Sequence, residues 1–385
     1  MSLKAKRPKR YLVWGYYGHG NLGDELMLKV IAGKLTEIDP DSEIYVRCYD
    51  APRVKGVISF PVEKPVINLP FIRHLIYIAR ILFAISKIDI LVIGGGTLFL
   101  DKGHFNQSMH LLNITVSFAK SLKKKVLVIG AGIDILECAK NIENLRNIFN
   151  KSDRIFLRDN FSYNMALSMT NGYKEKVYKS SDILFDAGYV ESLKRNVTIE
   201  KNVIVVSLSD YYKTWGSYHD RQRLMNSSCI LVERLLALYG EKYRILLAAF
   251  QKDTGERDYE FLLDIMNMVI AADRRYEDRI YLEYVVTEDQ IKAIFASAAF
   301  IVSMRYHALV LGAIFMKPFF GINIESKIRE ICLDFGMPFI DASNFLDKSI
   351  DEPGLSSLIG RTVDEDKLKE QILLSKTNFD WVAPA

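Results

Sequence analysis

The chain has 385 residues, of which 25% are charged and 49% are hydrophobic, and its formal net charge is +4. This length exceeds that of one ordinary hydrophobic core, so we expect two domains of similar size. The composition excludes extensive disorder, and the small charge imbalance excludes the concentrated basic surface of a nucleic-acid-binding protein.

The first half of the chain alternates short apolar runs with segments of helical periodicity. Several runs are apolar on both faces, as buried parallel strands require. Alternation of this kind predicts a doubly wound α/β domain. We expect strands at 11–14, 43–47, 88–93, 125–129 and 154–157, and helices at 24–38, 108–121 and 142–151.

The same alternation begins again after about residue 195. A weakly patterned charged segment at 189–201 predicts the linker, and a helix is expected at 365–376. The expected strands of this second half are 202–208, 244–249, 279–283, 300–303 and 318–322, and the expected helices are 221–239, 256–268, 288–298 and 306–315.

This pattern predicts an α/β protein with two Rossmann-like domains that face a central cleft, as in the GT-B architecture. We place the domains at 1–190 and 191–360, followed by a C-terminal helix and tail at 361–385. Open α/β sheets bind ligands at the carboxyl ends of their strands, so we expect the site there.

A glycine-rich loop follows the first predicted strand and opens the first helix. It contains Gly18, Gly20, Asn21 and Asp24. Glycines let the backbone approach a ligand closely, and a helix start offers N–H groups to an anion. The alternative is that these residues only build a tight turn.

Two further segments follow predicted strands of the N-terminal half. Gly95 and Gly96 come after the run 88–93, and Arg158 comes after the run 154–157. We expect open amides at the first strand end and an arginine that binds carboxylate or phosphate at the second. Asp159 would orient Arg158 or cap the next helix. The alternatives are a tight crossover for the glycines and a structural ion pair for Arg158.

The C-terminal half has an arginine and a histidine between a strand and a helix. Arg305 is placed to hold an anion, and His307 has a side chain that gives or takes a proton near neutral pH. Lys327 adds a cation after the next strand. The alternatives are a structural histidine and a surface lysine.

The remaining titratable residues predict neither a metal site nor a cofactor. No pair of histidines has metal-ligand spacing. The four cysteines are scattered, which suits a reducing compartment, so we expect a cytoplasmic protein. These cysteines are Cys48, Cys138, Cys229 and Cys332.

The most hydrophobic segment, 71–85, is interrupted by Arg73, His74 and Arg80. It is too polar and too short to span a bilayer. It is either a core helix or a helix that rests on the inner face of the membrane, where the basic start of the chain, 4–10, could also meet anionic lipid.

In order along the chain, these motifs resemble those of the polysaccharide pyruvyl transferases. The segments that carry the resemblance are Gly18-His-Gly-Asn-Leu-Gly-Asp-Glu25, Gly94-Gly-Gly, Arg158-Asp159, Met304-Arg-Tyr-His-Ala-Leu309 and Lys327. The resemblance implies a GT-B-like fold, phosphoenolpyruvate as donor, and as acceptor a sugar of a cell-surface polysaccharide or of its lipid-linked precursor.

Ketal formation from this donor would suit the candidate residues. Arg158, Arg305 and Lys327 would bind the carboxylate and phosphate, and His307 would protonate the methylene carbon or assist the leaving phosphate. The glycine loop, with Asn21 and Asp24, would line the acceptor side, where Asp24 or Glu25 would be a base for a hydroxyl group. Gly95 and Gly96 would also contact a substrate.

Two other functions fit the same fold. One is a glycosyltransferase that uses a nucleotide sugar, with Glu325 binding the ribose. The other is a non-catalytic scaffold, in which the cationic residues would be replaced or buried.

Overall fold

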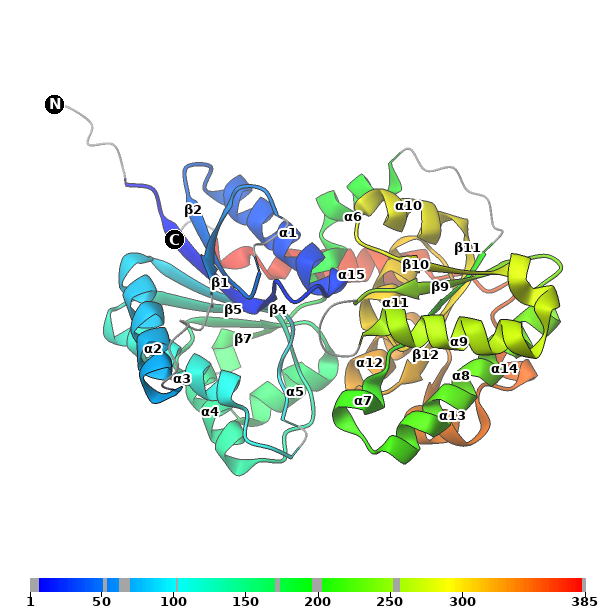
Figure 1. The fold of residues 1–385 in the computed structure, drawn as a ribbon. Coiled ribbons are helices and arrows are strands. Elements are labelled where there is room, and N and C mark those ends of the chain that lie inside the picture. Colours follow the sequence, from blue (N-terminus) through cyan, green and yellow to red (C-terminus); the bar gives the residue numbers. More distant parts are fainter. Residues whose placement is uncertain are drawn as a thin grey trace. The chain divides into compact units, whose positions relative to one another are not determined.

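The computed structural model describes residues 7–50, 54–61, 70–101, 103–169, 174–195, 203–251 and 257–382. The chain divides into two compact units (Figure 1). Unit 1 comprises Met1–His19, Asp24–Asp186 and Leu373–Ala385, and unit 2 comprises Gly20–Gly23 and Ala187–Ile372. The tip of the glycine-rich loop therefore belongs to unit 2, and the end of the chain belongs to unit 1.

Unit 1 contains a parallel sheet with the strand order β3-β2-β1-β4-β5-β6-β7 in its described part. Its strands are β1 (Arg10–Tyr17), β2 (Glu43–Cys48), β3 (Val57–Pro61), β4 (Ile90–Phe99), β5 (Lys125–Ile133), β6 (Arg154–Leu157) and β7 (Val177–Lys179). Its helices are α1 (Leu22–Ile38, from Asp24 on), α2 (Pro70–Lys87), α3 (Gln107–Ser121), α4 (Ala139–Lys151), α5 (Asn160–Met169) and the end of α15 (Glu365–Thr377).

Unit 2 contains a second parallel sheet with the order β10-β9-β8-β11-β12-β13 in its described part. Its strands are β8 (Val203–Ser207), β9 (Arg244–Ala249), β10 (Ile280–Tyr284), β11 (Ala298–Ser303), β12 (Phe319–Asn323) and β13 (Phe339–Asp341). Its helices are α6 (Ala187–Lys194), α7 (Tyr211–Trp215), α8 (Tyr218–Tyr239), α9 (Asp258–Ala272), α10 (Glu288–Ser297), α11 (Tyr306–Ile314), α12 (Ser326–Phe335), α13 (Ala342–Lys348), α14 (Glu352–Ser356) and most of α15. In the described parts of both units, the 3-10 helices are Lys174–Lys176, Ile183–Phe185, Arg274–Arg279 and Asp380–Val382.

The two sheets confirm the predicted GT-B-like, Rossmann-like fold class. Each central strand is buried on both faces by flanking helices, which explains its continuous apolar sequence. In unit 1, Leu12 of β1 and Val128 of β5 share one buried cluster with Ile148 of α4. In unit 2, Val206 of β8 shares a cluster with Leu235 of α8.

Helix α2 corresponds to the hydrophobic segment 71–85. Tyr77, Ile81 and Ile85 recur every four residues and are buried in the core of unit 1, as a core helix requires. Phe83 lies on the other face and is 65% exposed. The side chains of 70–75 and the start of the chain at 1–6 lie outside the described residues. No helix in the described ranges is both long and apolar enough to cross a membrane.

The glycines of β4 do not follow a strand end, so that prediction was wrong. Strand β4 continues through them to Phe99, and its pairing with β5 includes Gly94 opposite Ile129 and Gly96 opposite Ala131. Gly95 and Gly96 have φ angles of 72° and 82°. Glycines with these left-handed φ angles let the backbone of β4 depart from regular strand geometry while its hydrogen bonding to β5 continues. The presence of three glycines, which are poor strand formers, therefore did not mean that the strand ended.

The predicted linker begins as a helix, which was also a wrong prediction. Helix α6 covers Ala187–Lys194, and Tyr189, Val190 and Leu193 are buried. This helix has only eight residues, and its apolar side chains span little more than one turn. A helical periodicity this short cannot be identified from the sequence. The remainder of that segment, 196–201, and the predicted helix start at Glu256 lie outside the described residues.

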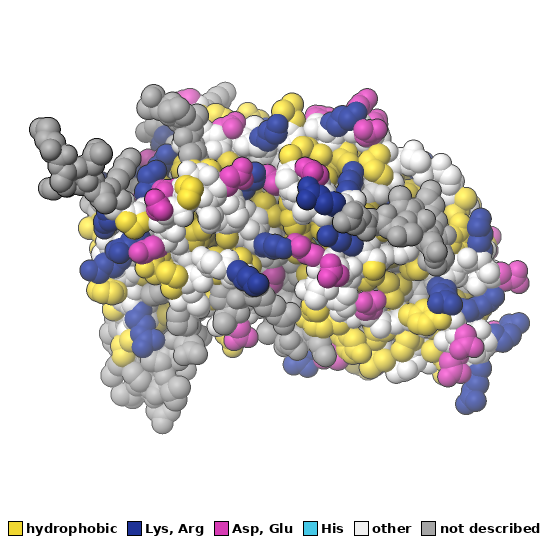
Figure 2. Space-filling model, turned by 90° about the horizontal axis from the view of Figure 1, so that it is seen from above, with side chains coloured by type: hydrophobic (Ala, Val, Ile, Leu, Met, Phe, Trp, Pro, Cys, Tyr) yellow, Lys and Arg dark blue, Asp and Glu magenta, His cyan; other side chains and the backbone are white. Residues whose placement is uncertain are grey.

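The surface agrees with the small net charge. On the face shown in Figure 2, the Lys and Arg side chains of the described residues are interspersed with Asp and Glu and are not gathered by sign.

The end of the chain is fastened to unit 1 by Asn378. This fully buried side chain donates to the carbonyl of Ser181 at 3.1 Å and accepts the N–H of Gly130 at 2.8 Å. Replacement by alanine leaves two buried backbone groups unsatisfied, so we expect Asn378→Ala to lower the free energy of unfolding by about 2–4 kcal/mol in urea denaturation. Lys376→Ala, at an exposed position of α15, should change it by less than about 0.5 kcal/mol. Equal stability of the two variants would contradict this anchoring role.

Candidate functional site

The strand order of unit 2 creates a switch point between β8 and β11. The chain leaves β8 toward β9 and β10 on one side, and leaves β11 toward β12 and β13 on the other. Loops at the carboxyl ends of such a strand pair diverge and leave room for a ligand. Arg305 lies there, between β11 and α11, and its backbone N–H donates to the hydroxyl of Ser303 at 2.7 Å.

The guanidinium of Arg305 is fixed by a buried carboxylate. Its Nε donates to Oδ2 of Asp258 at 2.9 Å, and its Nη2 binds Oδ1 of the same side chain. Nη2 also donates to Gln251 at 3.2 Å. Asp258 is fully buried and accepts the backbone N–H of Phe250 at 3.2 Å. This two-point contact sets the plane of the guanidinium before any ligand arrives.

The tip of the glycine-rich loop is tied to the same part of unit 2. Leu22 donates its N–H to the carbonyl of Phe250 at 3.0 Å, and Asn21 forms an antiparallel bridge with Gln251. The side chain of Asn21 accepts the N–H of Gly23 at 3.1 Å, which holds the turn. Gln251 therefore links Asn21 to Arg305.

The imidazole of His307 lies directly against Gly23. A Cβ atom at position 23 would stand 1.7 Å from Nδ1 of His307, so no residue other than glycine fits beside the ring in this arrangement. Tyr306 packs edge-on against the imidazole, with 5.2 Å between the ring centroids. The structure thus brings together Asn21, Gly23, Arg305 and His307 from opposite ends of the sequence. Gly20 precedes them in the same loop and has a φ of 71°.

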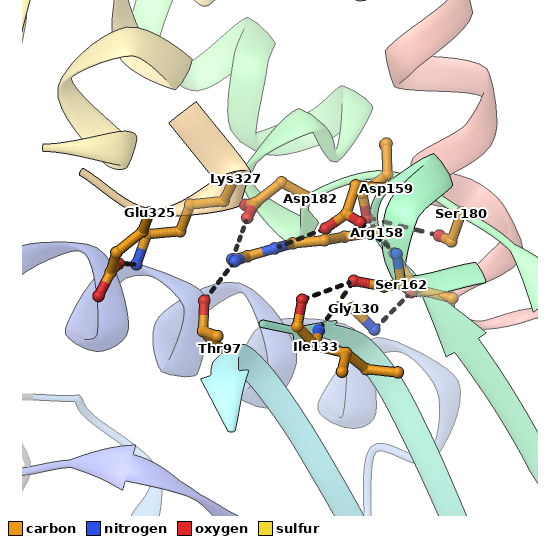
Figure 3. A network of polar contacts seen from close by, with 12 residues as sticks. Thr97, Gly130, Ile133, Arg158, Asp159, Ser162, Ser180, Asp182, Glu325 and Lys327 are labelled. Carbon is orange, nitrogen blue, oxygen red and sulfur yellow. Dashed lines mark hydrogen bonds and ion pairs between the residues drawn. The ribbon is translucent and has the colours of Figure 1, made fainter. Parts of the chain in front are cut away.

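Lys327 occupies the first turn of α12, after β12. Its Nζ forms an ion pair with Glu325, drawn in Figure 3, and its side chain is 24% exposed. Because β11 and β12 are neighbouring parallel strands, Lys327 and Arg305 lie at the same edge of the sheet.

Unit 1 has its own switch point, between β1 and β4. The hydroxyl of Tyr17 donates to the carbonyl of Gly94, and burial raises the pKa of Tyr17 well above its ordinary value, with Asp24 and Glu25 adding to the shift. Asp24 is 8% exposed, and its Oδ1 would be 2.8 Å from a Cβ at Gly96. A carboxylate thus lies against the irregular part of β4.

The remaining glycines of this edge have packing roles. Gly18 donates its N–H to Glu25 at 2.6 Å and has a φ of 76°. A Cβ at Gly95 would approach the hydroxyl of Tyr17 to 3.0 Å. A Cβ at Gly18 would also come within 2.6 Å of the backbone of Asp50, so both glycines permit a close approach.

Arg158 is buried in unit 1, with a side chain only 1% exposed. Figure 3 shows it between Thr97 and Asp182: Nη2 donates to the Thr97 hydroxyl at 2.6 Å and Nη1 to Asp182 at 3.5 Å. Asp159 lies 3.6 Å from its Nε and caps α5 by accepting the N–H of Ser162 at 2.7 Å. A ligand could displace these partners only at the cost of a buried charge contact.

Asp258 and Gln251 were not found by the sequence reasoning. Asp258 belongs to the acidic first turn of α9, where carboxylates are common because they face the helix dipole. Gln251 follows β9 with no motif around it. An acidic partner could have been sought from Arg305, because a partly buried arginine needs a counter-charge nearby.

The sequence of residues 21–326 matches the family model described as "Polysaccharide pyruvyl transferase". This span includes Asn21, Asp24, Arg158 and Arg305 with His307, and ends just before Lys327.

The chain belongs to the polysaccharide pyruvyl transferase family.

Solved structures share the fold of this family member at low sequence identity. The UDP-GlcNAc 2-epimerase of Methanocaldococcus jannaschii is 12% identical, with a TM-score of 0.63, covering 96% of this chain and 98% of its own. The UDP-GlcNAc 2-epimerase of Neisseria meningitidis bound to UDP-GlcNAc is 12% identical, with a TM-score of 0.57 and the same coverage. Anabaena Alr3699/HepE in complex with UDP and glucose is 11% identical, with a TM-score of 0.53, covering 98% and 96%.

No curated protein matches the sequence of this pyruvyl transferase family member. Membership of the family implies a transferase. Across the ranges that the structure describes, no three His, Cys, Asp or Glu side chains gather as ligands of a metal ion would.

The contact of Gly23 with His307 predicts that a methyl group here displaces the imidazole. We expect Gly23→Ala to shift the ring resonances of His307 in NMR spectra and to destabilise the fold by about 1–3 kcal/mol. The control is Gly33→Ala, because Gly33 lies inside α1 with nothing within 4 Å of an added Cβ. It should leave those resonances unchanged and stabilise by up to about 1 kcal/mol. Unchanged His307 resonances in Gly23→Ala would refute the contact.

The Asp258–Arg305 pair predicts a large effect of neutralising one partner. Asp258→Asn keeps the volume but leaves the guanidinium without its carboxylate, so we expect the free energy of unfolding to fall by about 3 kcal/mol. Asp264→Asn, at an exposed position of the same helix, should change it by under about 0.5 kcal/mol. Denaturant titrations that give the same midpoint for both variants would show that the pair is not structural.

Proposed function

We propose that this protein transfers a pyruvyl group from phosphoenolpyruvate to a sugar of a cell-surface polysaccharide or of its lipid-linked precursor, forming a ketal and releasing phosphate. The observation that carries the proposal is the grouping of Arg305, His307 and the glycine loop tip at the switch point of unit 2. Membership of the pyruvyl transferase family supports the same reaction.

The donor is a small trianion with a carboxylate and a phosphate. Arg305 suits it because Asp258 holds the guanidinium plane, so little freedom is lost when an anion binds. Lys327 supplies a second cation at this edge, with Glu325 beside it. Both residues belong to unit 2, which we therefore assign to the donor.

The reaction moves two protons. Two sugar hydroxyl groups add to the second carbon of the donor, and the bond from that carbon to the phosphate oxygen breaks. One proton is gained by the methylene carbon, which becomes a methyl group, and the other leaves with hydrogen phosphate. We assign His307 to deliver the proton to the methylene carbon or to the leaving phosphate. Arg305 stabilises the charge that develops on the leaving group.

Unit 1 provides the acceptor side in this proposal. Asp24 is the base for a sugar hydroxyl, because its carboxylate lies at the β1–β4 switch point against Gly96. We further assign Gly18, Gly95 and Gly96 of unit 1, and Gly20 and Asn21 of unit 2, to contacts with the substrates. Arg158, which the sequence predicts to bind the donor, binds Thr97 and Asp182 at this edge in the structure. A direct contact with the substrate would require one of these partners to release it.

We place the reaction in the cytoplasm, at the membrane when the acceptor is lipid-linked. The four cysteines are free, and burial raises the pKa of the Cys332 thiol to about 12 and that of Cys229 to about 11. Such thiols stay protonated and unreactive. The scattered free cysteines suit a reducing environment.

Replacing His307 removes the proposed proton donor. We expect His307→Gln to lower the rate of acceptor-dependent phosphate release from phosphoenolpyruvate by roughly 10²–10⁴-fold. The control His219→Gln changes an exposed histidine at the start of α8 and should keep the wild-type rate.

A folded His307→Gln protein that turns over at the wild-type rate would remove His307 from the mechanism. Release of UDP from a nucleotide sugar, with no consumption of phosphoenolpyruvate, would instead favour a glycosyltransferase.

A further inference from the structure

Three aromatic rings form a column at the carboxyl edge of the unit 1 sheet. His19 stacks on Tyr16, with 4.0 Å between ring centroids and an angle of 10° between ring planes. Tyr49 stacks on the other side of His19, at 5.0 Å and 22°. We call Tyr16, His19 and Tyr49 the aromatic column. It belongs to none of the catalytic roles assigned above.

The column is built by the backbone as well as by the rings. Gly18 and Gly20 flank His19 with φ angles of 76° and 71°, which turns the chain so that the imidazole stands between the tyrosines. Tyr49 donates its N–H to the carbonyl of Tyr17 at 3.0 Å, and Asp50 donates to that of Gly18 at 3.3 Å. A Cβ at Gly18 would lie 2.6 Å from the backbone of Asp50. Tyr49 and Asp50 are thereby fixed to the glycine loop.

The column ends in exposed surface. The side chain of Tyr49 is 57% exposed and that of Tyr16 is 44% exposed. Single exposed rings are common on protein surfaces, but a stack of three rings with exposed ends presents a flat apolar face. Such a stack beside a sheet switch point is suited to a ligand that stacks.

Among the described residues, the charges around the column favour a neutral ligand. Burial and the charge of Arg47 lower the pKa of His19, with Asp50 opposing them, so the middle ring is uncharged at neutral pH. The guanidinium of Arg47 is directed to the Trp14 ring, at 4.3 Å, and to the Tyr77 hydroxyl, at 2.8 Å. Asp50 is exposed beside Tyr49 and would repel a phosphate group, whereas it accepts hydrogen bonds from hydroxyl groups.

We propose that the outer ring face of Tyr49 is a sugar-binding subsite, where a pyranose ring of the acceptor saccharide stacks and Asp50 accepts hydrogen bonds from its hydroxyl groups. One face of a pyranose presents C–H groups of slightly positive character, which complement the negative face of an aromatic ring. The assignment of this sugar as the acceptor rests on the proposed function, but sugar binding by the column does not.

The test is saturation-transfer NMR with the full chain and with three probes: methyl β-glucopyranoside, methyl β-galactopyranoside and uridine. We expect at least one glycoside to receive saturation on the protons of one ring face. Tyr49→Ala should weaken its binding roughly 3- to 10-fold, and Tyr49→Phe should retain it, because stacking does not need the hydroxyl. The control Tyr218→Ala removes a 74% exposed tyrosine of unit 2 and should have no effect.

Three results would overturn the subsite: no saturation of either glycoside by the wild-type protein, equal glycoside binding by wild type and Tyr49→Ala, or Tyr49-dependent saturation of uridine alone. The last result would assign the column to a nucleobase.

A kinetic measurement separates this proposal from the proposed function. With phosphoenolpyruvate as donor, Tyr49→Ala should raise the acceptor KM while leaving the donor KM unchanged. If the glycosides bind through Tyr49 and no phosphate is released from phosphoenolpyruvate with any acceptor, the subsite stands and pyruvyl transfer fails. If phosphate is released and the acceptor KM of Tyr49→Ala equals that of the wild type, the assignment of the subsite to the acceptor fails and pyruvyl transfer stands.

Discussion

A guanidinium held by a buried carboxylate is the interaction on which the donor side of this protein depends. Burying a charge is costly unless it is paired and hydrogen-bonded, and Asp258 meets this need for Arg305 with two contacts. The pair also fixes where the cation stands, at the carboxyl end of β11. An anion that arrives there meets a donor group that is already oriented, which is the condition for strong electrostatic stabilisation of a transition state.

The glycines of the first loop act mainly by lacking side chains. Gly23 leaves room for the His307 imidazole, and Gly18 leaves room for the backbone of Asp50. One loop therefore serves two surfaces: its tip packs on the residues we assign to the donor, and its start shapes the aromatic column. This division gives a physical reason for so many glycines in a short segment.

The sequence was sufficient for the fold class and for much of the candidate site. The runs that became β6 and β9 are short and apolar, and the run that became β2 alternates polar and apolar residues. Both patterns are typical of strands. The histidine and arginine after β11 were identifiable because a strand end followed by a helix start is a common ligand site. The family resemblance added the order of the motifs.

Other features could not be predicted, for identifiable reasons. Strand β4 runs through three glycines because its neighbours in the sheet hold it, and local propensity does not contain that information. Asp258 has the appearance of an ordinary acidic helix start, and only the folded chain shows that it faces Arg305. The stacking of His19 between Tyr16 and Tyr49 depends on left-handed glycines and on pairing between β1 and β2.

The most direct test of the donor assignment is calorimetric titration of phosphoenolpyruvate into the wild-type protein and into Arg305→Gln, each repeated with UDP present. We expect the wild type to bind phosphoenolpyruvate, Arg305→Gln not to bind it, and UDP to leave the binding unchanged. If the wild type binds UDP but not phosphoenolpyruvate, or if Arg305→Gln binds phosphoenolpyruvate as tightly as the wild type, the donor assignment is wrong.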